Sequence, residues 1–278
     1  MNLFRTREGA LTDVNTKTQL TTVGSRTAPG ALLVPGSASF LRAAYVAAVS
    51  SNEAADQSGY IVRLEGPGIN RGVFNFAAGA NGGAVATGGN VLVASTRVPI
   101  NIKVIPGQEV LVFAEVVGDD EGTYQASVTL EFGTEAGPEG ESLGEVTVEG
   151  DITAVDTLTR LTAQGSVTAP SRLTPPDAKT LKRLIYAVAS DAAADGEVTF
   201  HVVLGGDAVK GGEQIITLGA TSFIDVQSGS DAGRTAMRAM VLDNLDIEVA
   251  PNETLDISGE MAGVDVGSAT MIVTAVFN

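Results

Sequence analysis

The sequence contains no cysteine, no tryptophan and a single histidine, and these absences exclude several classes of function. Without cysteine there is no disulfide, no thiolate metal site and no thiol nucleophile. A catalytic triad or a zinc site at His201 would lack the further histidine or cysteine ligands that complete such sites. The glycine pairs at 205–206 and 211–212 lack the spacing of a phosphate-binding loop. We therefore expect a protein that is not an enzyme, with no catalytic residues, and a structural or surface role for His201.

Basic residues and long apolar runs are also scarce. The chain has 33 acidic and 17 basic residues, a formal charge of −16 that repels nucleic-acid phosphates and anionic lipids. The most apolar stretch, residues 40–49, is too short to span a bilayer and is interrupted by Arg42. The N-terminal residues lack the apolar segment of a secretory signal. We expect no direct nucleic-acid partner, no membrane insertion and no export signal.

The composition that remains is that of a globular protein. Apolar residues make up 44% of the chain and charged residues 18%, whereas aromatic residues make up only 5%. The core must therefore be built mainly from valine, isoleucine, leucine and alanine. A length of 278 residues accommodates two domains of ordinary size, each large enough to bury its own core.

An internal repeat is the dominant feature of the sequence. Residues 8–29 and 149–170 are identical at 13 of 22 positions without a gap. The same offset then matches three further pairs of identical residues: Pro35 with Pro176, Arg42 with Arg183 and Tyr45 with Tyr186. This similarity predicts that the chain arose by duplication of one domain.

A second offset aligns the remaining part of the two copies. It matches Ile102, Val104 and Pro106 with Ile247, Val249 and Pro251, Glu115 with Glu260, and Val128, Thr129 and Phe132 with Val273, Thr274 and Phe277. The predicted organisation is an N-terminal arm (1–7), a first domain (8–133), an acidic, glycine-containing linker (134–148) and a second domain (149–278).

Short segments of alternating apolar and polar residues predict β-strands. In the first copy they cover approximately 16–23, 40–49, 60–65, 73–76, 91–95, 100–104, 109–117 and 124–132, and the last two are expected to form a hairpin, as are their counterparts in the second copy. The fold class is therefore all-β, with two tandem antiparallel β-sandwiches. Eight strands suit a jelly roll, although an immunoglobulin-like sandwich with extra strands has a similar count.

Acidic loops are the one candidate for metal binding. Asp119, Asp120 and Asp265 lie in equivalent turns, after Glu115 and Glu260 on the preceding strands, and carboxylate oxygens are calcium ligands. One or two carboxylates per loop fall short of the six to eight ligands of calcium, and aspartate and glycine are also the usual residues of tight turns. We expect no bound cofactor, with calcium as the alternative.

Two further residue sets bear on binding. Sugar-binding sandwiches stack aromatic rings on the ligand, but the chain has only four tyrosines, and Tyr45 and Tyr186 fall in expected core strands. The pair Arg42 and Arg183 is expected to reach the sheet edge or to pair with a carboxylate, with an interface role as the alternative.

Two tandem β-sandwiches, a short charged arm and no catalytic constellation resemble the tandem jelly-roll proteins of virus particles. The resemblance is architectural and covers both copies. It implies self-association, because in that family three chains with two jelly rolls each form a pseudo-hexagonal capsomer. It also implies other virion proteins as partners. Similar but non-identical halves suit such quasi-equivalent positions.

The expected function is therefore a structural protein of the virion, either a capsid building block or a capsid-decoration protein that forms a symmetric trimer. Two alternatives remain open at this point. One is a carbohydrate-binding or adhesion module, and the other is a subunit of an extracellular filament; either would place the protein outside the cell or at its surface.

Overall fold

The computed structural model describes residues 2–11, 13–27, 31–50, 57–82, 91–118, 124–167, 169–191, 197–222, 234–264 and 268–278. All regular elements within these ranges are strands, so none of these residues forms a helix that could cross a membrane. The first half contains β1 (Leu3–Leu11), β2 (Thr18–Gln19), β3 (Thr22–Val23), β4 (Arg26–Thr27), β5 (Phe40–Ser50), β6 (Gln57–Glu65), β7 (Val73–Gly82), β8 (Val91–Lys103), β9 (Leu111–Gly118) and β10 (Tyr124–Gly133). The second half contains β11 (Gly144–Ile152), β12 (Thr159–Arg160), β13 (Thr180–Asp191), β14 (Glu197–Gly205), β15 (Gln214–Ser222), β16 (Arg234–Arg238), β17 (Met240–Leu242), β18 (Ile247–Glu248), β19 (Asp256–Val264) and β20 (Ala269–Phe277).

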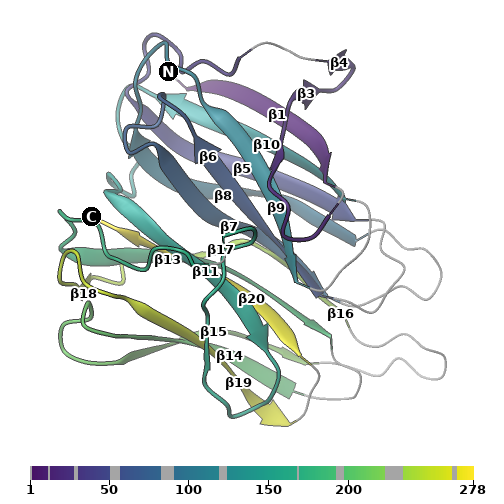
Figure 1. Cartoon of the computed structure of the whole chain (residues 1–278), viewed down its shortest axis with the longest axis vertical. Coiled ribbons are helices and arrows are strands. Elements are labelled where there is room, and N and C mark those ends of the chain that lie inside the picture. Colours follow the sequence, from purple (N-terminus) through teal and green to yellow (C-terminus); the bar gives the residue numbers. More distant parts are fainter. Residues whose placement is uncertain are drawn as a thin grey trace.

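The strands of each half pair in a nested, antiparallel order (Figure 1). In the first half β1 pairs with β10, β2 with β9, β5 with β8 and β6 with β7. In the second half β11 pairs with β20, β12 with β19, β13 with β16, β17 and β18, and β14 with β15. The resulting sheets contain the orders β1-β10-β5-β8 and β2-β9-β6-β7, and then β11-β20-β13-β16 and β12-β19-β14-β15. This is the topology of a jelly roll, so the expected fold of two tandem jelly-roll sandwiches is confirmed.

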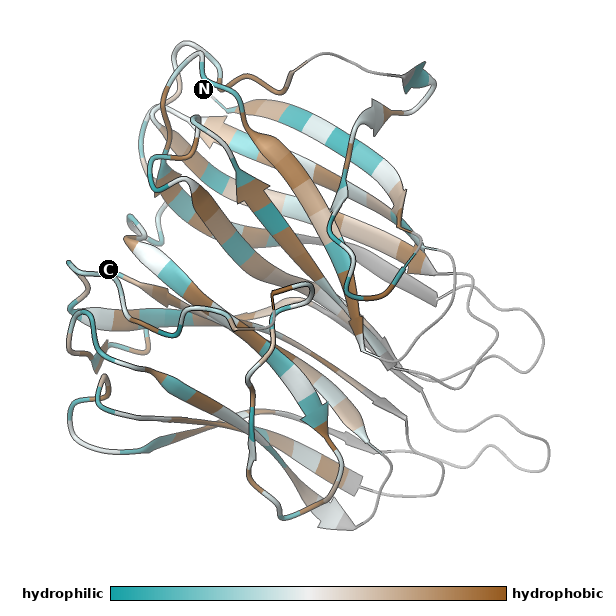
Figure 2. Ribbon diagram, in the orientation of Figure 1, coloured by the Kyte–Doolittle hydropathy of each residue, from teal (hydrophilic) through white to brown (hydrophobic). Residues whose placement is uncertain are grey.

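Alternation along the strands explains which face each sheet buries. In β10 Ala126, Val128 and Leu130 are buried, whereas Ser127 and Thr129 between them remain partly exposed. Figure 2 shows the same alternation as stripes of contrasting hydropathy along the strands. In β20, by contrast, all nine residues are buried. Both faces of β20 are covered, one by the core of the second half and the other by the first half.

The predicted domain limits need correction at two places. Residues 3–7 are not a free arm, because β1 pairs with β10 from Leu3 opposite Phe132 onwards. The connection between the halves ends at residue 143 instead of 148, because Gly144 already pairs with Phe277 in β11 and β20. The start of β1 could not be recognised from apolar alternation, since residues 3–7 combine Leu-Phe with two arginines, and the acidic composition before β11 favoured a linker over a strand.

The predicted hairpins are also wrong. β9 pairs with β6 and β2, whereas β10 pairs with β1 and β5, so the two consecutive strands lie in opposite sheets. The same holds for β19 and β20. In a nested topology the chain crosses from one sheet to the other between these strands. The two short strands predicted at 91–95 and 100–104 are one strand, β8.

The alignment that matches residues 8–29 with 149–170 shifts by one residue before β5 and β13. Ala38 donates its backbone N–H to Pro35 O, and the equivalent bond runs from Ala178 to Pro175. The structural partner of Pro35 is thus Pro175 and not Pro176. The following pairs change accordingly: Arg42 corresponds to Lys182, Ala43 to Arg183 and Tyr45 to Ile185. A one-residue deletion in the second half explains the shift, and chance identities obscured it in the sequence.

Packing between the halves depends on a glycine, Gly59, on β6. Ile185, Ile272 and Val276 of the second half belong to the hydrophobic core of the first half. A Cβ atom at Gly59 would collide with Cδ1 of Ile272 and lie 3.0 Å from its Cγ1. Glycine at this position therefore allows β20 to approach the outer face of β6.

We expect the substitution Gly59→Ala to lower the free energy of unfolding by about 1–3 kcal/mol, because the added methyl group overpacks the contact with buried Ile272. Gly36→Ala is the control, since a Cβ at that position meets no atom within 4 Å, and it should change stability by no more than about 0.5 kcal/mol. Urea unfolding of the two variants measures the difference. Equal stabilities would contradict this account of the interface.

Candidate functional site

The junction between the two halves is the most elaborate polar site in the described part of the chain, and it is built on the free edge of β7. Backbone N–H of Asn75 donates to Glu145 Oε1 at 2.9 Å, and its side-chain Nδ2 donates to the same oxygen at 3.2 Å. Backbone N–H of Ala77 donates to Thr274 Oγ1 at 2.9 Å. Thr147 Oγ1 donates to Asn75 O at 3.2 Å and lies 2.9 Å from Thr274 Oγ1. Side chains of β11 and β20 thus satisfy the edge of β7 that faces them.

The remaining part of the β7 edge is satisfied by a strand of the second half. Residues 79–81 of β7 pair with residues 236–238 of β16, which also pairs with the end of β13. One continuous sheet of ten strands therefore runs through both halves. Because unpaired edges expose backbone groups that recruit other strands, this pairing removes a site of aggregation.

Arg183 ties the junction together from β13. Its side chain is only 2% exposed, and its Nε donates to Asp243 Oδ1 at 2.9 Å. Nη1 donates to Pro99 O of β8 at 3.2 Å, and Nη2 donates to Glu139 O of the connection at 3.0 Å. One guanidinium group therefore bonds both halves and the segment between them. Arg183 thus pairs with a carboxylate, as expected, and also contacts the interface between the two halves.

A buried carboxylate closes the other end of the junction. Glu115 of β9 is fully buried, and its Oε1 lies 3.3 Å from Nη2 of Arg63 on β6. Its Oε2 accepts the backbone N–H of Ser166 in the second half at 2.7 Å, and Ser166 Oγ lies 3.1 Å from Oε1. Glu115 therefore bonds a cation of the first half and a loop of the second half.

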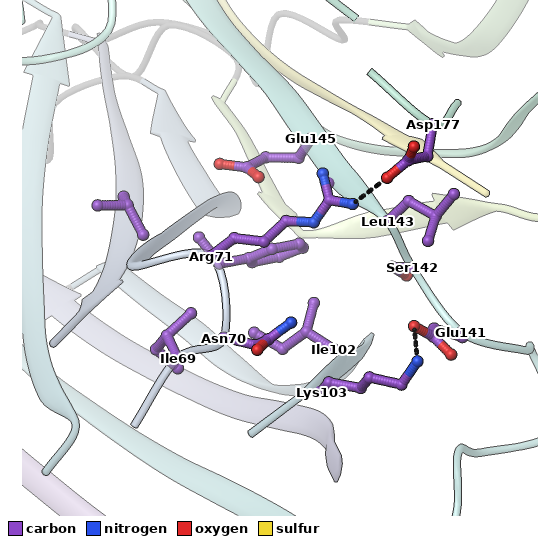
Figure 3. Close-up of a pocket in the computed structure, with 13 residues that line it drawn as sticks. Ile69, Asn70, Arg71, Ile102, Lys103, Glu141, Ser142, Leu143, Glu145 and Asp177 are labelled. Carbon is purple, nitrogen blue, oxygen red and sulfur yellow. Dashed lines mark ion pairs between the residues drawn. The ribbon is translucent and has the colours of Figure 1, made fainter. Parts of the chain in front are cut away.

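A cavity of about 210 Å³ lies where the connection between the halves passes the β6–β7 turn (Figure 3). Arg71 pairs with Asp177 across it at 3.5 Å, and Lys103 pairs with Glu141 at 2.8 Å. Glu145 also lines this cavity. Four of the charged side chains that line the cavity thus form two ion pairs, an arrangement that fits a structural junction.

Burial governs the protonation of the junction carboxylates. Desolvation raises the pKa of Glu145 to about 8, although the N–H groups of Asn75 and the charge of Arg71 act in the opposite direction. Desolvation likewise raises the pKa of Glu149 to about 7; the bond from backbone N–H of Gly165 opposes this shift, and nearby Asp151 and Glu115 add to it. Both carboxyl groups therefore hold a proton in the folded chain at pH values where free glutamate is ionised.

The calcium candidates Asp119, Asp120 and Asp265 lie outside the described residues, so calcium binding there stays a prediction. Within the ranges that the structure describes, no three histidine or acidic side chains are grouped as metal ligands. His201 lies on β14, where its ring nitrogens lie 3.1 Å from Thr199 Oγ1 and 3.2 Å from Thr217 Oγ1.

The other singled-out residues have separate environments. Arg42 donates to Glu135 O at 2.7 Å and to Asn2 Oδ1 at 2.8 Å, near the start of β1. Tyr45 is partly exposed and donates its hydroxyl to Glu131 at 2.9 Å, which corrects the expectation that it is a core residue. Tyr186 is buried, and its hydroxyl donates to Leu218 O.

Arg183 and Glu115 were singled out in the sequence, but the other residues that build the junction were missed because they form no motif. Asn75 and Glu145 have no signal in the sequence that distinguishes them from other polar strand residues. Thr274 belongs to the repeated Val-Thr pair, and its counterpart Thr129 forms the same contact in the first half, 2.9 Å from Thr6 Oγ1. The repeat could therefore have indicated the threonine pair, but not the strand edge that it binds.

No protein-family model and no curated protein matches the sequence. Among solved structures, the chain is similar to the STIV major capsid protein, with 12% identity over 98% of this chain and 97% of that chain and a TM-score of 0.37. It is similar to PNGF-II, with 13% identity over 98% of this chain and 65% of that chain and a TM-score of 0.43. It is also similar to a chain of Red Clover Necrotic Mosaic Virus, with 12% identity over 98% and 96% and a TM-score of 0.18. In architecture the chain resembles tandem jelly-roll virion proteins, and this assignment rests on the strand order described above.

We expect the substitution Arg183→Met to lower the free energy of unfolding by about 3 kcal/mol, because it leaves the buried carbonyl of Pro99, the partly buried carbonyl of Glu139 and the carboxylate of Asp243 without their donor. The neighbouring variant Lys182→Met is the control, since Lys182 forms an exposed ion pair with Asp246 that should contribute no more than about 1 kcal/mol. Thermal or urea unfolding of both variants measures this. A similar loss in both would contradict a special role for Arg183.

We expect the free energy of unfolding to fall as the pH rises from 4.5 toward 8, because folding raises the pKa of Glu145 over this interval. The folded chain then binds more protons than the unfolded chain, and stability decreases with pH until the folded carboxyl group is ionised. Glu145→Gln should remove its share of this slope, whereas Glu135→Gln, at an exposed position of the connection, should retain it. Urea unfolding at a series of pH values decides between these outcomes, and identical slopes for wild type and Glu145→Gln would refute the assignment.

Proposed function

We propose that the chain is a non-enzymatic structural protein of a virus particle, either a capsid building block or a capsid-decoration protein that assembles as a symmetric homo-oligomer. One observation carries the proposal. In the second jelly roll, the outer face of the sheet that contains β11, β20 and β13 binds the β7 edge of the first jelly roll. The first half carries the equivalent face, formed by β1, β10 and β5, and no other part of the described chain docks a strand edge on it.

Three properties of the molecule support a building block in preference to a ligand-binding enzyme. The two jelly rolls are joined rigidly by a shared sheet, a buried arginine and a buried glutamate. The cavity between them is lined by two ion pairs, Arg71 with Asp177 and Lys103 with Glu141. The net charge of −16 disfavours contact with a nucleic acid, so that other virion proteins and further copies of the chain are the expected partners.

A trimer is the symmetric oligomer that we propose. Three chains contribute six jelly rolls, and two similar halves in each chain can occupy nearly equivalent positions around a ring. No cofactor is required for this arrangement. The virion is the corresponding location.

A carbohydrate-binding module is the second candidate, and one observation favours it. Phe4 and Tyr45 lie side by side on the outer face of the first half, with ring centroids 6.2 Å apart and an interplanar angle of 59°. Phe4 is 50% exposed, and exposed rings of this kind can stack on a sugar. Such a module would be monomeric and would bind ligands on a glycan array.

We expect the purified protein to form trimers or larger symmetric particles, as measured by light scattering coupled to size-exclusion chromatography and by electron microscopy. A strict monomer at high protein concentration would contradict the proposal. A monomer that also binds glycans, with loss of binding in Phe4→Ala, would establish the second candidate in its place.

A further inference from the structure

We propose that the β15 edge of one chain docks on the β1·β10·β5 face of a second copy and so repeats, between chains, the contact that joins the two halves within a chain. The inference rests on the proposed self-association and names the surfaces that carry it. In the described part of the single chain no strand pairs with the outer edge of β15, and no strand edge docks on the β1·β10·β5 face. β15 and β8 are end strands of their sheets, whereas their counterparts β7 and β16 pair with each other.

The strand registers define which residues are equivalent. Phe4 pairs with Glu131 in the first half as Glu145 pairs with Val276 in the second, so Phe4 takes the place of Glu145. Arg63 pairs with Asn75 as Val203 pairs with Ile215, so Ile215 takes the place of Asn75. The bulge that follows lies at the same position in β7 and β15. The two edges therefore have the same shape.

Several groups that build the internal contact are present unchanged at the proposed external one. Thr6 and Thr129 form the same hydroxyl pair as Thr147 and Thr274, with the same separation of 2.9 Å. The inner pair is buried by Asn75 and Ala77 of β7, whereas the outer pair is partly exposed. The outer pair is thus ready to accept the backbone N–H of Thr217 and to donate to the carbonyl oxygen of Ile215.

The glutamate and its serine partner are also duplicated, whereas Val203 takes the place of the cation Arg63. Glu260 is the counterpart of Glu115, and Ser25 is the counterpart of Ser166. In both halves the turn glycine before the serine has φ near +54° and donates its N–H to the glutamate of the first strand, as Gly24 does to Glu8. Ser25 is exposed in the single chain. It can bond Glu260 of another copy as Ser166 bonds Glu115.

At one position where both residues differ, the difference remains compatible. The internal contact joins the polar groups of Asn75 and Glu145, whereas the external contact brings together Ile215 and Phe4. These two side chains are 65% and 50% exposed, and they are among the exposed large apolar residues of the described chain. Docking buries these two exposed side chains against each other in one apolar contact, which is favourable.

A second compensating pair concerns size. Inside the chain, Gly59 leaves room for Ile272. At the proposed contact between chains the corresponding residues are Thr199 and Ser127. Thr199 on β14 is larger than Gly59, and Ser127 on β10 is smaller than Ile272. The larger side chain on one surface thus offsets the smaller side chain on the other, as expected when two surfaces adapt to each other.

The free edges complete the argument. β7 and β16 pair over residues 79–81 and 236–238, and the corresponding residues are 219–221 of β15 and 92–94 of β8 by strand register. Both segments lie in end strands. An open edge that exposes isoleucine is an aggregation hazard unless a defined partner covers it. A second copy that supplies β8 would extend the sheet across the chain boundary.

The absence of cysteine from the chain permits a direct test by cross-linking. The double variant Phe4→Cys/Ile215→Cys, treated with a short bismaleimide, should give covalent oligomers on a denaturing gel. Phe4→Cys/Ile105→Cys is the control, because Ile105 is also exposed but lies in the turn after β8. It should give monomers. Cross-linking that is equal in both variants would overturn the proposal.

A second measurement does not depend on the cross-linker. Ile215→Glu should weaken self-association roughly thirtyfold or more, since it places a charge at an apolar anchor of the interface. Ile105→Glu should leave it unchanged, and circular dichroism should show both variants folded because both side chains are exposed. Phe4→Lys protein mixed with Ile215→Glu protein should regain association, because each mixed pair contains one intact Phe4–Ile215 contact.

The outcomes separate this inference from the proposed function. If the wild type is oligomeric and Ile215→Glu has no effect, the protein assembles through another surface and the docking proposal is wrong. If the wild type is a strict monomer at high concentration, both proposals fail. Oligomers that dissociate with Ile215→Glu but not with Ile105→Glu, and that re-form on mixing, support the proposed surfaces.

Discussion

The arrangement of this chain depends on how the open edge of β7 obtains hydrogen-bond partners. An edge strand of a jelly roll exposes backbone N–H and C=O groups that a solvent-free contact must satisfy. Glu145, Thr147 and Thr274 supply side-chain partners at one end of this edge, and β16 supplies a ladder at the other. Because the two kinds of partner come from different strands of the second half, the angle between the halves is fixed once they are formed.

The same constraint accounts for the unusual burial of polar and charged groups. Glu145, Glu149 and Glu115 lie between two sheets that are otherwise built from small and aliphatic residues, and each is bonded to backbone N–H groups across a strand or loop. Arg183 bonds one carboxylate of the junction, together with two carbonyl groups. Groups of this kind stabilise a particular geometry more than they stabilise folding in general, since apolar residues could fill the same space.

Much of the fold was predictable from the sequence, because alternation and repetition report directly on strands and on their number. The strands at 40–50, 57–65 and 124–133 were expected at nearly the correct limits. Strand pairing was not, because the nested order joins strands distant in sequence and separates neighbours such as β9 and β10. The deletion before β13 escaped detection since identical residues on either side matched at the wrong offset. The junction residues Asn75 and Glu145 carry no sequence signal, because their roles depend on a contact between halves.

The contact between the halves has a direction, since it joins a strand edge on one side to a sheet face on the other. A contact of this type differs from a two-fold one, in which each partner offers the same surface. Any series of such contacts turns by a constant rotation at each step, and that rotation is set by how β16 and Arg183 hold the two jelly rolls of one chain. In the proposed assembly, the geometry of a single molecule determines whether a chain of molecules closes into a ring or continues as a helix, and with what curvature.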